Sequence, residues 1–309
     1  MIVVAGEALV DLAPRGGQLL PLPGGSPYNV AVGLARLEAE VAYLGGLSTD
    51  GFGQIMADRL RAEGADLALV AWSDAPTTLA VVHLDDDGRA SYGFYLDGTS
   101  AASLLESQLP PLPDGAALHI SMGAIGLEYD PAGRTLAALI AREHGRRFVS
   151  FDPNIRPSAI TGDVADHAAS MDELVTRLTL VKASDEDLQL LHPDRDPIEV
   201  ARSWAGSGPS LVVVTRGPDG AVALAPQGEP IAVPGESVQV VDTVGAGDAF
   251  TSGLLTWLDR HDALSDTGLR ALSAGQIEAA LVFARHVAAI TCTRAGSDPP
   301  HAAELAPEG

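Results

Sequence analysis

Short apolar runs alternate along the chain with segments of helical period. The run at 2–5 is apolar throughout, as expected of a strand that is buried on both faces. Runs of similar character follow at 39–44, 67–70, 117–121, 147–151, 179–181, 211–215 and 237–241. The clearest helical segments between them are 26–37, 50–64, 131–144 and 249–258. Repeated strand–helix–strand units predict an α/β fold, with a mainly parallel central sheet and helices on both of its faces.

Capping residues mark where the helices begin. Ser26 and Asp130 each precede a proline, and proline is favoured at the first position of a helix. Asp50 precedes a segment that ends near Gly64, a residue type typical of helix C-termini. We therefore predict N-caps at Ser26, Asp50 and Asp130.

The stretch 77–97 interrupts the alternation. Two β-rich runs, 78–84 and 90–96, flank Asp-Asp-Asp-Gly-Arg at 85–89, which predicts a hairpin. A hairpin between strand–helix units seldom joins a parallel sheet, so we expect it to form a small β-sheet lid together with 9–22. An antiparallel edge of the main sheet fits the pattern equally well. The whole chain, 1–309, is predicted to be one domain.

Composition and charge exclude several classes of protein. The chain is 46% apolar, no apolar run reaches the roughly 18 residues that a membrane helix needs, and the start lacks the basic region of a signal peptide. These features predict a cytoplasmic protein. A net charge of −22 argues against nucleic acid or anionic membranes as partners. The single cysteine, Cys292, excludes an intrachain disulfide and a cysteine-rich zinc site.

The run from Val240 to Phe250 carries the strongest chemical signal. A predicted strand ends there in a turn that contains Gly245 and Gly247, and a helix follows. Such a turn directs backbone N–H groups and the positive end of the helix dipole at one point, which favours an anion. Glycine suits the turn because it permits positive φ and a close approach to the backbone.

Asp248 adds a second function to this anion site. A carboxylate would repel a bound phosphate unless it orients a hydroxyl group and accepts its proton, and that pairing indicates phosphoryl transfer to an alcohol. For a bare Gly-x-Gly-Asp the simpler interpretation is that Asp248 only stabilises the start of the helix. Other phosphate sites are excluded. Lys182 is the only lysine and has no P-loop or protein-kinase context, and Phe250 occupies the third glycine position of a Rossmann fingerprint.

The nine residues D-T-V-G-A-G-D-A-F at 242–250 resemble the C-terminal signature of the PfkB/ribokinase family of carbohydrate kinases at every fixed position. The resemblance implies a ribokinase-like fold in which Asp248 is the catalytic base, beside an anion hole formed by Gly245, Ala246 and Gly247. Residues 24–29 resemble the family's N-terminal signature, and residues 6–11 resemble the opening of its fructokinase-like members. The sugar hydroxyls would then be bound by Asp11, Gly25, Asn29 and Asp248.

Two further motifs follow predicted strands. D-P-N-I-R at 152–156 matches the family's D-x-N-x-R, which implies that Asn154 and Arg156 face the phosphate or the substrate. A planar guanidinium suits the neutralisation of transition-state charge, whereas the alternative is a turn held by an Asp152–Arg156 salt bridge. K-A-S-D-E-D at 182–187 resembles the segment that organises Mg²⁺, with Ser184 and Asp187 in place of Asn and Glu. An acidic first helix turn explains that segment equally well.

The remaining motifs concern the nucleotide and a monovalent cation. T-R-G-P-D-G at 215–220 resembles the family's nucleotide-side turn. The implied nucleotide-binding residues are Ser184, Thr215, Gly217, Gly220, Gly245 and Gly247. Residues 291–296 resemble its monovalent-cation loop, although Pro300 replaces a small hydroxyl residue. The implied K⁺ site comprises Asp242, Val244, Thr291, Arg294 and Gly296.

The sequence thus predicts an ATP- and Mg²⁺-dependent sugar kinase that phosphorylates a primary hydroxyl, with fructose as the first candidate. The alternatives are 2-keto-3-deoxygluconate kinase and ribokinase-like activity. In similar kinases an arginine often follows the pair that corresponds to Phe94-Tyr95, but here Leu96 does. An acid sugar would need a cation in the lid, so this departure disfavours an acid sugar most. A noncatalytic sugar or nucleotide sensor would be expected to have lost the base or a glycine of the anion hole, and both are present. The resemblance also allows a homodimer through the lid.

Overall fold

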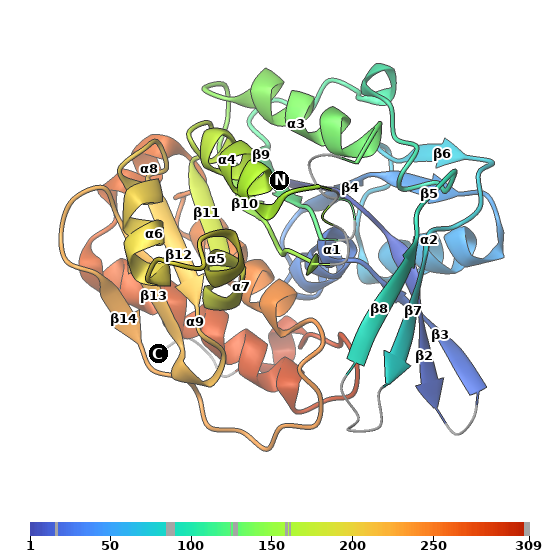
Figure 1. Ribbon diagram of the computed structural model, residues 1–309. Coiled ribbons are helices and arrows are strands. Elements are labelled where there is room, and N and C mark those ends of the chain that lie inside the picture. The colour runs from blue at the N-terminus through green and yellow to red at the C-terminus, as the bar shows by residue number, and fades with distance from the viewer. Residues whose placement is uncertain are drawn as a thin grey trace.

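An eight-stranded sheet forms the centre of the computed structural model, which describes residues 1–15, 18–84, 90–123, 125, 129–157, 160 and 162–305. The strand order is β14-β13-β12-β11-β10-β9-β1-β4 (Figure 1). The strands from β12 to β4 are parallel, and β13 is antiparallel to both of its neighbours. Their bounds are β1 Ile2–Ala5, β4 Val41–Leu44, β9 Ala117–Ser121, β10 Val149–Asp152, β11 Leu180–Ser184, β12 Leu211–Thr215, β13 Ala221–Leu224 and β14 Ile231–Val233.

Helices cover both faces of this sheet. In β1, Val3 and Ala5 join one apolar cluster while Ile2 and Val4 join another, because successive side chains of a strand point to opposite faces. The first cluster includes side chains of α3 Ala132–Glu143, α4 Val164–Val175, α5 Asp185–Leu191 and α6 Pro197–Ala205. The second includes side chains of α1 Ser26–Arg36, α2 Gly51–Glu63, α7 Ala246–Arg260, α8 Asp266–Ala271 and α9 Ala274–Cys292. The predicted α/β fold is confirmed.

A separate four-stranded sheet stands beside this body (Figure 1). It consists of β2 Leu9–Arg15, β3 Gln18–Gly24, β7 Leu79–Leu84 and β8 Ala90–Tyr95, in the order β3-β2-β7-β8. The antiparallel pairing of β7 with β8 confirms the hairpin, whose predicted turn at 85–89 lies outside the described residues. The parallel pairing of β2 with β7 confirms the predicted small sheet, so the interpretation as an edge of the main sheet is wrong.

Two predicted strands are wrong. Residues 237–241 form a loop in which the Val240 and Val241 side chains are 59% and 61% exposed, and the Val241 N–H donates to the Cys292 carbonyl at the end of α9. Their β-branched residues have strand propensity but no strand partner. The strand predicted at 67–70 lies instead at β6 Ala71–Ser73, where it pairs with β5 Gly46–Ser48.

The helix caps agree with the prediction at one of three positions. Asp50 caps α2 by accepting a hydrogen bond from the Gly53 N–H at 2.9 Å. At α1 and α3 the cap is one residue away from the prediction, at Gly25 and Pro131. Short 3₁₀ turns occur at η1 Glu106–Gln108, η3 Gly217–Asp219 and η4 Ala302–Glu304. No helix in the described ranges is long and apolar enough to span a membrane.

Asp50 also ties the main body to the small sheet. Its carboxylate accepts hydrogen bonds from the Thr77 N–H at 2.8 Å and the Thr77 hydroxyl at 2.6 Å, just before β7. Burial would raise the Asp50 pKa, but the hydrogen bonds from Thr77 and Gly53 outweigh it and lower the pKa to about 2. The carboxylate form is therefore the stabilising one.

We expect Asp50→Ala to lower the free energy of unfolding by about 1–2 kcal/mol at neutral pH, because the cap of α2 is lost. The stabilisation by a group with a lowered pKa is present above its unfolded pKa and is lost as the pH falls through the folded value. The difference between wild type and variant should therefore shrink as the pH falls from about 4 towards 2. Urea unfolding across this range measures it. Asp50→Asn, which keeps a capping oxygen, should lose less, and a pH-independent difference would contradict the account.

Candidate active site

The N-terminus of α7 is shaped by two glycines that have different functions. Gly245 is the N-cap and has φ 75°, a left-handed conformation that favours glycine. Gly247 has no positive φ, so the expectation of positive φ holds only for Gly245. A Cβ on Gly247 would instead lie 3.2 Å from Lys182 Nζ, tighter than most real Cβ contacts. Without a Cβ on Gly247, a ligand can approach the backbone of this first turn closely, as an anion site requires. The Ala246 N–H donates to the Thr243 carbonyl at 3.2 Å.

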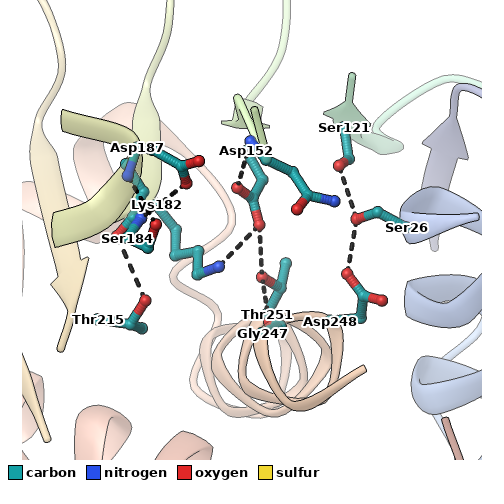
Figure 2. Close-up of polar contacts among 12 residues, drawn as sticks. Ser26, Ser121, Asp152, Lys182, Ser184, Asp187, Thr215, Gly247, Asp248 and Thr251 are labelled. Atoms are coloured by element: carbon teal, nitrogen blue, oxygen red, sulfur yellow. Dashed lines mark hydrogen bonds and ion pairs between the residues drawn. The ribbon is translucent and has the colours of Figure 1, made fainter. Parts of the chain in front are cut away.

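Asp248 lies in this turn, and two residues of α1 hold its carboxylate. Ser26 Oγ donates to Oδ1 at 2.6 Å (Figure 2). Asn29 Nδ2 donates to Oδ2 at 2.8 Å. Ser26 Oγ also lies 2.7 Å from Ser121 Oγ at the end of β9. Ser26 is free to do this because Gly25, with φ 101°, takes the N-cap position. Asn29, a predicted sugar-site residue, thus lies directly beside the predicted base.

The environment makes Asp248 a better proton acceptor than an exposed aspartate. Burial raises its pKa, and the Ser26 and Asn29 hydrogen bonds lower it in part. The charge of Asp152 raises the pKa further, while Lys182 lowers it, and the net direction is upward. A carboxylate with a raised pKa that is held in a fixed orientation is suited to general-base catalysis.

Asp152 forms its ion pair with Lys182, not with Arg156. The Lys182 ammonium donates to Asp152 Oδ2 at 2.9 Å, and both side chains are almost completely buried. Arg156 Nη1 donates instead to the carbonyls of Asn154 and Ile155, at 3.4 and 3.3 Å. The predicted turn held by Asp152 and Arg156 is therefore wrong.

Asp11 and Arg156 extend the site away from α7. Burial raises the Asp11 pKa, the Arg156 charge lowers it and the Asp248 charge raises it, with the result at about 6. Asn154 has φ 40°, in the left-handed region that non-glycine residues seldom adopt, and its N–H donates to Asp152 Oδ1 at 3.1 Å. The charges of Asp11, Arg156 and Asp248, which come from the N-terminal, central and C-terminal motifs, thus lie close enough to influence one another.

The predicted nucleotide residues lie at the ends of β11 and β12. Ser184 and Thr215 are paired in register across these strands. Gly217 and Gly220 have positive φ, 50° and 90°. Asp187 accepts hydrogen bonds from the Ile155 N–H at 2.9 Å and from the Ser184 N–H at 3.1 Å, so each of its oxygens already binds a backbone donor.

Asp242 connects the two segments predicted to hold a monovalent cation. Its Oδ1 accepts a hydrogen bond from the Val244 N–H at 3.1 Å, and its Oδ2 accepts one from the Gly296 N–H at 2.8 Å. The Thr291 hydroxyl donates to the Val287 carbonyl, and Arg294 is ion-paired with Glu304. Among the described residues, no group of three or more His, Cys, Asp or Glu side chains could hold a metal ion.

Sequence reasoning missed several of the residues around Asp248. Ser26 was interpreted as a helix cap, and Lys182 was used only to exclude other kinase families. Ser121 and Thr251 were not singled out. One signal was available, because Lys182 is the only lysine and stands in a strand adjacent to the one that carries Asp152. A charged residue within a buried strand needs a partner.

Comparisons with known proteins match this chain to carbohydrate kinases. The family model described as "pfkB family carbohydrate kinase" matches residues 2–303. A fructokinase from Rhizobium leguminosarum bv. trifolii is 39% identical over 271 residues, 86% of this chain and 82% of that protein. The fructokinase of Vibrio cholerae O395 in its fructose, ADP and calcium ion bound form has a TM-score of 0.82 at 31% identity, covering 96% of this chain and 94% of that one. Fructokinase with bound ATP from Xylella fastidiosa has a TM-score of 0.85 at 27% identity, covering 96% and 93%.

We expect Ser26→Ala to raise the pKa of Asp248, because the hydrogen bond from Ser26 stabilises the ionised carboxylate. A titration followed by ¹³C NMR of the Asp248 carboxyl carbon measures this, with the signal assigned by its loss in Asp248→Asn. Thr49→Ala, whose hydroxyl bonds the remote Asp74, is the control and should leave the midpoint unchanged. A midpoint in Ser26→Ala equal to that of wild type would contradict the assigned hydrogen bond.

Proposed function

Since the chain belongs to the pfkB family of carbohydrate kinases, we propose that this fructokinase-like enzyme uses ATP to phosphorylate fructose at a primary hydroxyl. One observation supports the proposal most strongly. A buried carboxylate, Asp248, lies in the first turn of α7, and the N-terminus of a helix favours an anion. A base fixed beside an anion site is the arrangement that phosphoryl transfer to an alcohol needs.

In the proposed reaction Asp248 accepts the proton of the sugar hydroxyl as its oxygen attacks the γ-phosphorus of ATP. The new bond joins that oxygen to phosphorus, the bond from phosphorus to the β–γ bridging oxygen breaks, and ADP leaves. The N–H groups of Gly245 and Gly247 stabilise the charge that develops on the phosphoryl oxygens. The Ala246 N–H joins them when it exchanges the Thr243 carbonyl for a phosphoryl oxygen. Arg156, in the segment that follows β10, supplies positive charge that neutralises the transition state.

The proposed sugar site comprises Asp11, Gly25, Asn29 and Asn154, around Asp248. Carboxylates outnumber cations in this region, which favours a neutral sugar over an acid sugar such as 2-keto-3-deoxygluconate. Leu96, at the position where the resemblance would place a lid arginine, is buried in an apolar cluster. Fructose therefore remains the first candidate, with 2-keto-3-deoxygluconate second.

The proposed nucleotide site lies at the ends of β11 and β12, with Ser184, Thr215, Gly217 and Gly220 beside the anion hole. We propose that Mg²⁺ enters with ATP and contacts Asp187 through water. The geometry fits a contact of this kind, because both Asp187 oxygens already accept backbone hydrogen bonds and Mg²⁺ usually keeps several waters. When bound, the ion neutralises phosphate charge. K⁺ would be held by carbonyl groups of the two segments that Asp242 connects.

We further propose that the four-stranded sheet is a lid over the sugar, since Asp11 belongs to its strand β2. The sheet carries exposed apolar side chains at Leu19, Leu20 and Tyr95. Exposed apolar groups of this kind favour association with a second copy of the sheet. A homodimer through the lid would cover them.

ADP release measured by a coupled assay across fructose, 2-keto-3-deoxygluconate, ribose and adenosine tests the proposal. We expect the highest kcat/KM with fructose. A higher value for another sugar would reassign the substrate, whereas no ADP release above background with any of them would indicate a noncatalytic sensor.

The pKa of Asp11 provides a second prediction. An ionised Asp11 is the stronger acceptor for sugar hydroxyls, and its pKa is about 6. Fructose affinity should therefore weaken as the pH falls through about 6, by up to tenfold per pH unit, and should be constant well above it. Calorimetry with fructose alone measures this without turnover. Asp11→Asn should bind fructose more weakly at pH 8 and lose the pH dependence, and an unchanged pH profile would argue against a contact between Asp11 and the sugar.

A further inference from the structure

Lys182 is a buried charge for which the reaction described so far has no use. It lies on β11 and is paired with Asp152 Oδ2 at 2.9 Å, and the two side chains are 7% and 1% exposed. Burial lowers the Lys182 pKa, but the charge and hydrogen bond of Asp152 outweigh it and raise the pKa above its usual value. The side chain is therefore an ammonium cation inside the protein.

This ammonium group lies against the first turn of α7. A Cβ on Gly247 would be 3.2 Å from Lys182 Nζ, which places Nζ within about 5 Å of the Gly247 Cα, since a carbon–carbon bond adds about 1.5 Å. Figure 2 shows Lys182 on the side of α7 that faces Asp152, and Asp248 on the side that faces Ser26. The anion site thus lies between the base and the cation.

The ion pair is also linked to the backbone of this turn. The Thr251 hydroxyl lies 3.0 Å from the Gly247 carbonyl, to which it donates, and 3.5 Å from Asp152 Oδ2. An ammonium group has three N–H donors. Within the described part of the chain, the hydrogen bond to Asp152 is the only one that Lys182 Nζ makes, which leaves donors for a ligand.

Stability alone does not account for this pair. Removal of two charges from water costs several kcal/mol per ion, and apolar side chains of similar volume often stabilise a protein as well or better. Apolar side chains fill most of this core. A cation that keeps N–H donors next to an anion site is more readily explained by a ligand.

We infer that Lys182 is a further catalytic residue, whose ammonium group donates to a non-bridging oxygen of the phosphoryl group during its transfer. Asp152 and Thr251 are positioning residues that hold Nζ against the first turn of α7. The inference rests on the proposed kinase function. The competing explanation is that Lys182 only balances the charge of Asp152.

A double variant separates the two explanations. Lys182→Met alone leaves Asp152 buried without its cation, so any loss of activity could come from the altered fold. Asp152→Asn/Lys182→Met removes both charges. If Lys182 acts on the phosphoryl group, we expect the double variant to fold but to keep a kcat about 10²- to 10³-fold below wild type, with a fructose KM within a few-fold. Recovery of wild-type kcat in the double variant would overturn the inference.

Arg147→Met is the matched control. It breaks the ion pair of the half-buried Arg147 with the buried Glu143 of α3, on the other face of the sheet from α7. Glu143 keeps its ion pair with Arg142. We expect it to lower Tm without changing kcat at a temperature where the protein is folded. An equal loss of kcat in the control would assign the Lys182 effect to general destabilisation.

A binding measurement decides the question independently of turnover. ADP with aluminium fluoride and Mg²⁺ imitates the transferring phosphoryl group, and transition-state analogues bind more tightly than substrates. We expect the increase in Tm from this mixture over ADP with Mg²⁺ alone to be large in wild type and much smaller in the double variant. Equal increases would contradict a contact with Lys182. An inactive wild type would refute the proposed function, yet the comparison of these shifts would still report on Lys182.

Discussion

The carboxylate of Asp248, held by α1 at the N-terminus of α7, is the constraint from which the rest of the site follows. Helix N-termini favour anions, so Asp248 and a bound phosphate compete for the same positive potential. Ser26 and Asn29 fix the carboxylate so that it faces α1. In the proposed reaction this leaves the start of the helix to the phosphate, where the Ala246 N–H now donates to the Thr243 carbonyl at 3.2 Å. In the proposed reaction the turn would bind the phosphoryl group, while Asp248 would accept the proton of the hydroxyl group that attacks it.

This arrangement has consequences elsewhere in the fold. Position 25, the N-cap of α1, requires glycine, because its φ is 101° and a Cβ there would lie 2.7 Å from the Glu7 carbonyl oxygen. The negative charge of three buried or half-buried aspartates, Asp11, Asp152 and Asp248, is opposed by Arg156 and Lys182. The parallel sheet makes this possible, since the carboxyl ends of β9, β10 and β11 meet at one edge beside α7.

Local patterns in the sequence were enough to predict the fold and the first turn of α7. Periodicity identified six parallel strands of the main sheet, β1, β4, β9, β10, β11 and β12. Turn chemistry identified the hairpin of the small sheet. The run at 237–241 misled because β-branched residues there have strand propensity, whereas tertiary contacts with the end of α9 set the backbone. Ser26 bonds Asp248, which is 222 residues away, and Lys182 bonds Asp152, which is 30 residues away on the neighbouring strand. No local pattern in the sequence specifies such pairs.

The most direct test of the account is to remove the base and keep the shape of its side chain. In Asp248→Asn, kcat should fall by about 10²- to 10⁴-fold, the range that general-base catalysis contributes. Calorimetry on the same preparation should give a fructose affinity within a few-fold of wild type, since the proposed sugar contacts of Asp11 and Asn154 remain. A kcat close to that of wild type would contradict the central claim that Asp248 accepts the proton of the sugar hydroxyl.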